Sequence, residues 1–461
     1  MAAPDAAVND HGFPSRGTWA LLGVAFVLFA AYASLVPFHL RQLPVDSAFR
    51  AFREVVTHLP RLRFSRTDLV ANVLLFVPIG FCLNGALRLG RTRWWSGPMA
   101  ALFVLGISIP WSLAIEFAQL FTADRITSMG DVAAQTFGTI VGVVLWESFG
   151  TDLTAWLRAA TAARSRTERI ERLLASYVVL WAFVNLAPFD LTLDLGTLAA
   201  KFRRGGIRLV PLPFARPDGA LGPWLWDLVS TGLAALPIGA YAVLGRTRDL
   251  RRRHWLRAAQ LSLAVLLLLE VTQLFVASHV ADVNDFLVGC AGAGLGIWLA
   301  WRLSARPAAA GPAAFAPTVS WGAVAALAGW CLVLGAYHWM PYDFSTDTQM
   351  IRRKLAGMSL IPFAGYHVGP DLSALDQLLV KTSLSLPLGV IAGFVLRLPP
   401  GSTAARLANV GALLLAGAVL TGIEAGQLLL PSRYADPTDV LVGVVAAGIG
   451  LAIARWIRRG H

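Results

Sequence analysis

A glutamate recurs at one fixed interval in three apolar stretches of this sequence. Glu116, Glu270 and Glu424 are each 154 residues apart and open the segments "EFAQLFTADRITSMGD", "EVTQLFVASHVADVND" and "EAGQLLLPSRYADPTD". In every copy a Gln follows after three residues, a basic or titratable residue after nine, and an Asp after fifteen. These followers are Gln119, Arg125 and Asp131, then Gln273, His279 and Asp285, then Gln427, Arg433 and Asp439. Self-similarity in one register indicates a repeat architecture.

This set of side chains favours binding over catalysis. On a helix the Glu and the Gln three residues later share one face, and the Asp opens the next helix, where it can cap free N–H groups and meet the positive end of the dipole. The basic residue lies in the turn between them, within reach of both acids. Paired carboxylates can do acid–base work, but no copy repeats a nucleophile beside a base and no His pair has metal-ligand spacing. We therefore expect no catalytic residue, no metal and no cofactor.

Two interpretations of the Glu motif remain open. The Glu lies about six residues from the end of its apolar stretch, roughly 9 Å below the membrane interface, and an ionisable group near mid-membrane costs about 2.5 to 3.5 kcal/mol. In one interpretation Glu, Arg and Asp form an ion-paired clasp that fixes a helical hairpin. In the other they line a polar pocket that holds a ligand head group. His279 replaces the Arg in the second copy and is interpreted as a polar loop residue.

A second motif, Pro-x-Gly, lies one helix earlier in "FVPIG", "ALPIG" and "SLPLG". We expect it to be structural, because Pro in a span frees a backbone carbonyl that a neighbour must satisfy. The polar residues ahead of the Pro are Asp68 and Asn72, then Asp227 and Thr231, then Gln377 and Lys381. We expect Lys381 of the third copy either to neutralise Glu424 or to extend to the interface. A third motif, "VPF", "APFD" and "MPYD", ends the first helix of each copy at Pro37, Pro188 and Pro341.

Composition assigns these motifs to a membrane protein. Of the 461 residues 56% are apolar and only 14% charged, and the mean hydropathy is +0.61. The net charge of +12 comes mostly from Arg between the apolar runs, without a recognition motif, so we expect no nucleic-acid partner. The three cysteines lie inside apolar runs and behave as small hydrophobes.

Apolar runs of about twenty residues are long enough to cross the hydrocarbon layer. They predict an all-α integral membrane protein with about twelve transmembrane helices, and the Gly-rich fourth and eighth suit close helix packing. Each copy has four spans, an even number, so the copies are parallel repeats. The expected units are 1–160, 161–308 and 309–461. The expected spans are 18–37, 69–88, 95–121, 131–149, 173–189, 224–244, 256–277, 284–301, 320–339, 377–397, 406–430 and 438–456.

Arginine in the short loops predicts the orientation. The loops "RLGRTR" and "RTRDLRRRHWLR" lie on the side of the N-terminus, as does the basic 158–172 linker, whereas the short loops opposite carry at most one Arg. Both termini are therefore expected in the cytoplasm of a multi-pass cell-membrane protein, with the Glu motifs at the outer face.

At these residues the sequence resembles the VanZ-like family. The matching pattern is Asp68, Asn72, Phe76, Pro78 and Gly80 in "DLVANVLLFVPIG", followed by Glu116, Gln119, Arg125, Asp131 and Gly138. The first unit matches best. The second unit departs from the pattern at Thr231 and His279, and the third unit departs from it at Gln377 and Lys381.

The resemblance implies a multi-pass plasma-membrane protein without established enzymatic activity, in a family named for a member that gives low-level resistance to teicoplanin, a lipoglycopeptide. Our leading hypothesis is a non-enzymatic envelope protein that contacts membrane lipids and binds a lipid-linked or amphipathic, glycopeptide-like ligand at the outer face. A transporter or lipid flippase is the alternative, because polar groups within the membrane also line substrate paths. An envelope enzyme that uses the paired carboxylates is the second alternative.

Overall fold

In a computed structural model the chain forms three sets of four long helices, as the apolar runs predict. The structure describes residues 12–57, 66–90, 96–163, 165–186, 192, 194–208, 210–211, 221–244, 252–276, 280–304, 318–365, 371–399 and 401–458. Within these residues ten helices are long and apolar enough to cross a membrane. The two remaining long helices are α9, whose described apolar part is Leu228–Val243, and α7, which starts in a charged segment.

The long helices of unit 1 are α1 (Arg16–Leu35), α3 (Arg66–Arg88), α4 (Ser96–Gln119) and α5 (Met129–Leu145). Those of unit 2 are α7 (Arg166–Leu186), α9 (Leu221–Leu244), α10 (Arg252–Leu274) and α11 (Val283–Ser304). Those of unit 3 are α12 (Trp321–His338), α14 (Asp371–Val395), α15 (Thr403–Gln427) and α16 (Pro437–Arg458). The fourth helix of unit 1 exceeds its expected span, because it continues through η1 (Trp146–Gly150) into α6 (Thr151–Thr161).

The second and fourth helices of each unit pack most closely, and glycine allows this. A Cβ added at Gly80, Gly239 or Gly389, the glycines of the Pro-x-Gly motif, would overlap a backbone carbonyl of the fourth helix. Small residues let membrane helices approach in this way. The packing role expected of the glycines on the fourth helices is also confirmed, because a Cβ added at each of them would overlap a carbonyl of the second helix. These residues are Gly138, Gly142, Gly292, Gly296 and Gly450.

Each long segment after the first helix of a unit contains a short helix that the apolar pattern did not predict. These helices are α2 (Val45–Thr57), α8 (Leu195–Arg203) and α13 (Thr348–Gly357). They are too short and too polar to be spans. Two short strand pairs also occur, β1 (Ile207–Arg208) with β2 (Ala281–Asp282), parallel, and β3 (Thr318–Val319) with β4 (Leu396–Arg397), antiparallel.

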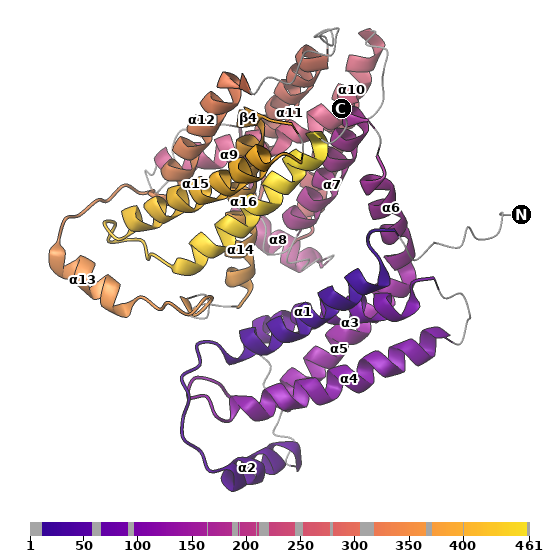
Figure 1. The fold of residues 1–461 in the computed structure, drawn as a ribbon, viewed down its shortest axis with the longest axis vertical. Helices are drawn as coiled ribbons and strands as arrows, with labels where there is room; N and C mark the ends of the chain where they lie inside the picture. The colour runs from indigo at the N-terminus through magenta and orange to yellow at the C-terminus, as the bar shows by residue number, and fades with distance from the viewer. Residues whose placement is uncertain are drawn as a thin grey trace, which may run out of the picture.

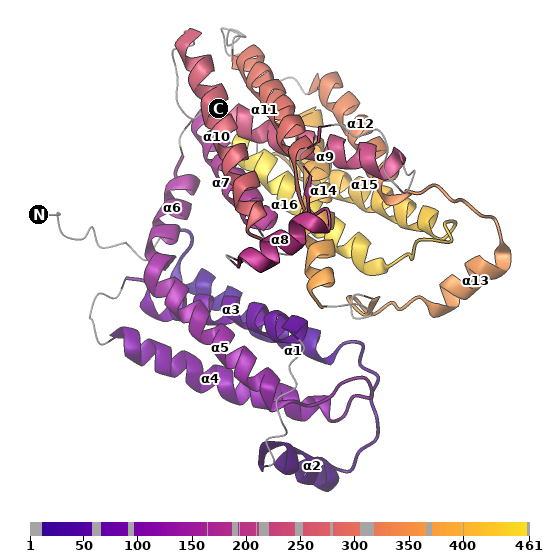
Figure 2. The same cartoon turned by 180° about the vertical axis from the view of Figure 1, so that it is seen from behind.

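Unit 3 contacts both other units (Figures 1 and 2). Toward unit 1, the Tyr32 hydroxyl donates to the carbonyl of Pro362 at 2.8 Å, and the Phe29 and Phe363 rings meet edge to face. Toward unit 2, Arg169 donates to the carbonyl of Trp456 at 2.7 Å.

Candidate functional site

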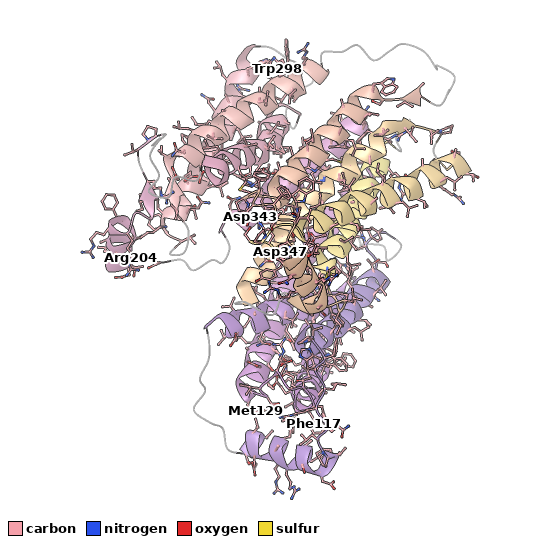
Figure 3. The ribbon with its side chains drawn as sticks, turned by 90° about the vertical axis from the view of Figure 1, so that its left-hand side faces the viewer. Phe117, Met129, Arg204, Trp298, Asp343 and Asp347 are labelled. Atoms are coloured by element: carbon pink, nitrogen blue, oxygen red, sulfur yellow. The ribbon has the colours of Figure 1, made fainter. Side chains whose placement is uncertain are left out.

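The Glu motifs lie where the third and fourth helices of a unit are joined, and we call this the motif end of the unit. In unit 1 it brings together Phe117 near the end of α4 and Met129 at the start of α5, close to α2 (Figure 3). The aromatic rings of α2 pack there, with Phe49 at 4.9 Å and Phe52 at 5.4 Å from the Phe117 ring centroid. The short helix α2 therefore covers the motif end.

The repeated Glu is held by the main chain. In unit 1 the backbone N–H of Ser128 donates to Glu116 Oε2 at 2.8 Å, and in unit 3 that of Asp436 donates to Glu424 Oε2 at 3.0 Å. In unit 2 the backbone of Asp282 contacts Glu270 in the same way. The donor is always the twelfth residue after the Glu. The contact closes the loop between the third and fourth helices.

The same twelfth residue caps the fourth helix, which corrects the expectation that the Asp three residues later is the cap. The Ser128 side chain accepts from the Gly130 N–H at 3.1 Å, and Asp282 and Asp436 accept from the backbone of Asn284 and Thr438. Sequence analysis missed this position, although Ser128, Asp282 and Asp436 also recur every 154 residues. The repeated acids Asp131, Asp285 and Asp439 lie in the first turn of the fourth helix, where they meet its dipole.

The repeated Arg reaches the first helix of its unit. Arg125 donates to the carbonyl oxygens of Ala33 at 3.4 Å and Val36 at 3.1 Å, and Arg433 donates to that of Met340 at 2.7 Å. These carbonyls lie at the C-terminal ends of α1 and α12, where a helix leaves acceptors unsatisfied. The Glu116 carboxylate accepts its hydrogen bond from Ser128, and Arg125 acts on it electrostatically. The main-chain hydrogen bond thus adds to the contacts expected of the clasp.

The repeated Gln makes the third tie of the motif end. Gln119 donates to the carbonyl of Ser34 at 3.1 Å, and Gln273 donates to that of Asn185 at 3.3 Å. Gln427 hydrogen-bonds to Nδ1 of His338 at 3.3 Å. Each partner stands three residues before the Pro that ends the first helix. His279 and the side chain of Asp227 lie outside the described part of the chain.

Lysines from the short helices complete the motif ends of units 2 and 3. Lys201 Nζ donates to the carbonyls of Gln273 and Val276, both at 2.7 Å, while Lys354 Nζ donates to those of Leu430 and Arg433. Partial burial lowers the pKa of Lys354. Sequence analysis missed these lysines, although each follows by seven residues an N-cap Asp, Asp194 or Asp347. Hydrogen bonds from Thr197 lower the pKa of Asp194.

Unit 1 also has a chain of buried polar side chains between its helices. The Ser112 hydroxyl donates to Gln135, the Gln135 amide donates to Asn72 at 2.8 Å, and the Asn72 amide donates to the carbonyl of exposed Asp68 at 3.1 Å. Ser108 and Thr139 hydrogen-bond one turn deeper, at 2.6 Å. Ser112, Gln135 and Thr139 are at most 1% exposed. We call this set, residues 68, 72, 108, 112, 135 and 139, the polar chain.

The other units have an apolar pair at the positions of Ser112 and Gln135. At the positions of Ser112 and Gln135, unit 2 has Leu266 and Gly289, and unit 3 has Leu420 and Gly443. In both units the Leu side chain lies directly against the Gly. In each unit a small residue therefore lies against a large one at these two positions. The pair is polar in unit 1 and apolar in units 2 and 3.

The hydrogen bonding of Glu116, the repeated Glu of unit 1, is less complete than that of the polar chain beside it. Glu116 is fully buried, and its Oε1 has no hydrogen-bond partner among the described residues. It shares a face of α4 with Ser112, one turn away. Asp131 and Arg125 both act on the carboxylate electrostatically. The site therefore offers a buried acceptor beside the polar chain. The described residues contain no group of three or more His, Cys, Asp and Glu side chains that could hold a metal ion.

The family model of VanZ/LLP1 matches this chain three times, at residues 13–150, 174–304 and 323–458. The three matches cover most of the chain, so the protein belongs to the VanZ/LLP1 family and consists of three tandem VanZ-like units. No curated protein and no solved structure matches it. The resemblance seen in the motifs is thereby confirmed, while the expected boundaries at 160 and 308 stay predictions.

Proposed function

We propose that the protein is a non-enzymatic protein of the cell membrane that binds a lipid-linked or amphipathic ligand at the motif end, mainly through unit 1. The observation that carries the proposal is Glu116, a fully buried carboxylate with one oxygen held by Ser128 and the other without a hydrogen-bond partner among the residues that the structure describes. An unsatisfied buried acceptor costs about 1 to 3 kcal/mol. A ligand donor that meets it would recover this cost.

The other members of the motif suit a supporting role in such a site. The repeated Gln and Arg tie the first helix to the turn, so they fix the wall against which a ligand would lie. Asp68 and Asn72 lead from the exposed start of α3 into the polar chain. The proposed orientation, with both termini cytoplasmic, puts this entrance at the outer face. Lipid-linked cell-wall precursors and lipoglycopeptides such as teicoplanin are the ligands to test first, and a resistance phenotype belongs to this proposal.

A transporter is the second candidate, and one feature of α5 favours it. Asp131, Gln135 and Thr139 share one face of α5 at four-residue spacing, and Glu147 follows in η1, so polar groups recur along most of the continuous helix. Glu147 pairs with Arg88 at 2.8 Å at the opposite end of the unit. Val143 interrupts this face, and the backbones of α3 and α5 are in close contact at Gly142. Binding without passage is therefore the preferred proposal.

The test uses purified full-length protein in lipid nanodiscs and a panel of lipid-linked cell-wall precursors with teicoplanin. Saturable binding without chemical change supports the proposal. Transfer of a fluorescent precursor across proteoliposomes would favour the transporter instead, and product formation would favour the enzyme. If none of the panel binds saturably, the proposed function is wrong.

A further inference from the structure

The short helices α8 of unit 2 and α13 of unit 3 are fixed at the ends of spanning helices. In unit 2, Lys201 Nζ donates to the carbonyl oxygens of Gln273 and Val276, where α10 ends, both at 2.7 Å. In unit 3, Lys354 Nζ donates in the same way to the carbonyl oxygen of Leu430, just after the end of α15. A spanning helix ends at the boundary between the hydrocarbon and the lipid head groups. Both short helices therefore lie at the level of the head groups.

Both helices expose large apolar side chains beside basic ones. Leu195 and Phe202 in α8 are 80% and 58% exposed, and Leu355 in α13 is 47% exposed. Figure 1 shows α13 at the edge of the molecule, outside the long helices. A short helix that combines apolar and basic side chains lies in the membrane interface, with its apolar groups among the acyl chains. We therefore expect lipid, and not protein, to cover these apolar side chains.

Each of the two helices carries two arginines without a carboxylate partner. Arg203 is the last residue of α8 and Arg204 its C-cap, while Arg352 and Arg353 lie in α13, and all four side chains are exposed. Figure 3 shows Arg204 at the outer edge of the molecule. None of the four forms an ion pair with a carboxylate in the part of the chain that the structure describes. Arg353 donates only within its own helix, to the carbonyl oxygen of Gln349 at 3.4 Å.

The acids of α8 and α13 are fewer than the basic residues, and they are engaged as helix caps. Asp194 accepts from the N–H of Thr197 at 2.7 Å, and Asp347 accepts from that of Gln349 at 2.8 Å. Each helix with its N-cap thus has one acid and three basic residues. The short helix α2 of unit 1 differs, because its two acids balance its two arginines. These exposed residues of α2 are Asp46, Arg50, Arg53 and Glu54.

We propose that α8 and α13 bind the head groups of anionic phospholipids in the leaflet at the motif ends, with their four exposed arginines as the phosphate-binding residues. A guanidinium group offers two parallel N–H donors that match two phosphate oxygens. The electroneutral α2 should show no preference for anionic lipid. This surface is separate from the ligand site proposed for unit 1, so either proposal can fail without the other.

The test measures which lipid lies beside each short helix. A bimane fluorophore is attached to one cysteine, Ala199→Cys in α8, Gly357→Cys in α13 or Val56→Cys in α2, in full-length protein whose native cysteines are replaced by Ala. The protein is reconstituted with phosphatidylcholine and phosphatidylglycerol, one of them brominated near the head group, and the quenching by each lipid gives the local preference. We expect at least about a fivefold preference for phosphatidylglycerol at α8 and α13, and none at α2. High salt should reduce the preference, because it screens exposed charges.

The decisive variant is Arg352→Gln with Arg353→Gln, which removes the charges of α13 but keeps side chains that can hydrogen-bond. We expect the preference at α13 to fall to that at α2, while the preference at α8 stays unchanged. The corresponding Gln pair in α8 should have the reverse effect. The matched control, Arg50→Gln with Arg53→Gln, removes the same charge from α2 and should change neither site.

A lack of preference at α8 and α13, a preference that survives the Gln pairs, or an equal preference at α2 would each overturn the proposal. Absence of quenching by either lipid would also overturn it, because the helices would then face water or another protein. If a Gln pair does not fold, the comparison of the three labelled helices with otherwise native arginines, at low and high salt, decides the question.

Discussion

Glu116 in α4 accepts a hydrogen bond from the backbone N–H of Ser128 at 2.8 Å, and this single contact joins the end of the third helix of unit 1 to the start of the fourth. Glu424 and Asp436 repeat the contact at 3.0 Å in unit 3. Because the donor belongs to the main chain, the contact depends on the acceptor oxygen and not on the charge of the acid.

Replacement of Glu116 by Gln should therefore preserve folding. The Gln side chain keeps an oxygen that can accept from Ser128, whereas Glu116→Ala leaves that buried N–H without its acceptor, at a cost of about 1 to 3 kcal/mol. We expect wild-type yield of monodisperse protein for Glu116→Gln and a lower yield and melting temperature for Glu116→Ala, measured by detergent-exchange chromatography and thermal melting. A Glu116→Gln protein as unstable as Glu116→Ala would mean that the charge itself holds the hairpin.

The close packing of the second and fourth helices predicts a large effect from one methyl group. Gly389→Ala should destabilise unit 3, because the added Cβ would overlap the Ala447 carbonyl, and overpacking typically costs about 1 to 3 kcal/mol. Gly411→Ala on α15 is the matched control, since nothing lies within 4 Å of its Cβ position. Thermal melting of both variants should show a loss only for Gly389→Ala, and equal melting temperatures would contradict the packing geometry.

The orientation predicted from the Arg-rich short loops can be tested with reporter fusions. A fusion in 246–257 should report the cytoplasm and one in 122–130 the outside. An external signal at 246–257 would reverse the topology and put the motif ends on the cytoplasmic side.

Much of the fold could be predicted from the sequence, because the apolar runs and the glycines act locally. Length and hydropathy place the long helices, and the glycines of the fourth helices, such as Gly138 and Gly142, indicate close helix packing, although not its partner. The short helices α2, α8 and α13 were missed because a search for spans passes over short amphipathic segments.

Less of the site could be predicted, because its partners come from distant segments. The sequence indicates that Arg125 lies in the turn but not that it reaches carbonyls of α1, about ninety residues away. The sequence left Lys381 either to neutralise Glu424 or to extend to the interface, whereas the packing of α14 against α16 brings it to Asp439, from where it also acts on Glu424 electrostatically. The polar chain was missed because single Ser and Gln residues in apolar spans, such as Ser112 and Gln135, show no repeat.

The three units are expected to contribute unequally. Only unit 1 combines Asp68 and Asn72 with a complete Glu, Arg and Asp set, so Glu116→Ala should reduce ligand binding more than Glu270→Ala or Glu424→Ala. Binding of the first saturable ligand from the panel is measured in each variant and divided by the amount of folded protein. Equal losses would indicate a shared central site, and a larger loss at Glu270 or Glu424 would overturn the ranking.

The most direct test of the account exchanges the polar pair inside unit 1 for the apolar pair of the other two units. The double variant Ser112→Leu and Gln135→Gly should fold, because Leu266 with Gly289 and Leu420 with Gly443 already pack this way in the same chain. Nanodisc binding of the lipid-linked panel is measured for this variant and for the wild type at equal amounts of folded protein. We predict normal thermal stability with binding weakened at least about tenfold; a stable variant with unchanged binding would contradict the assignment of the ligand site to the polar interior of unit 1.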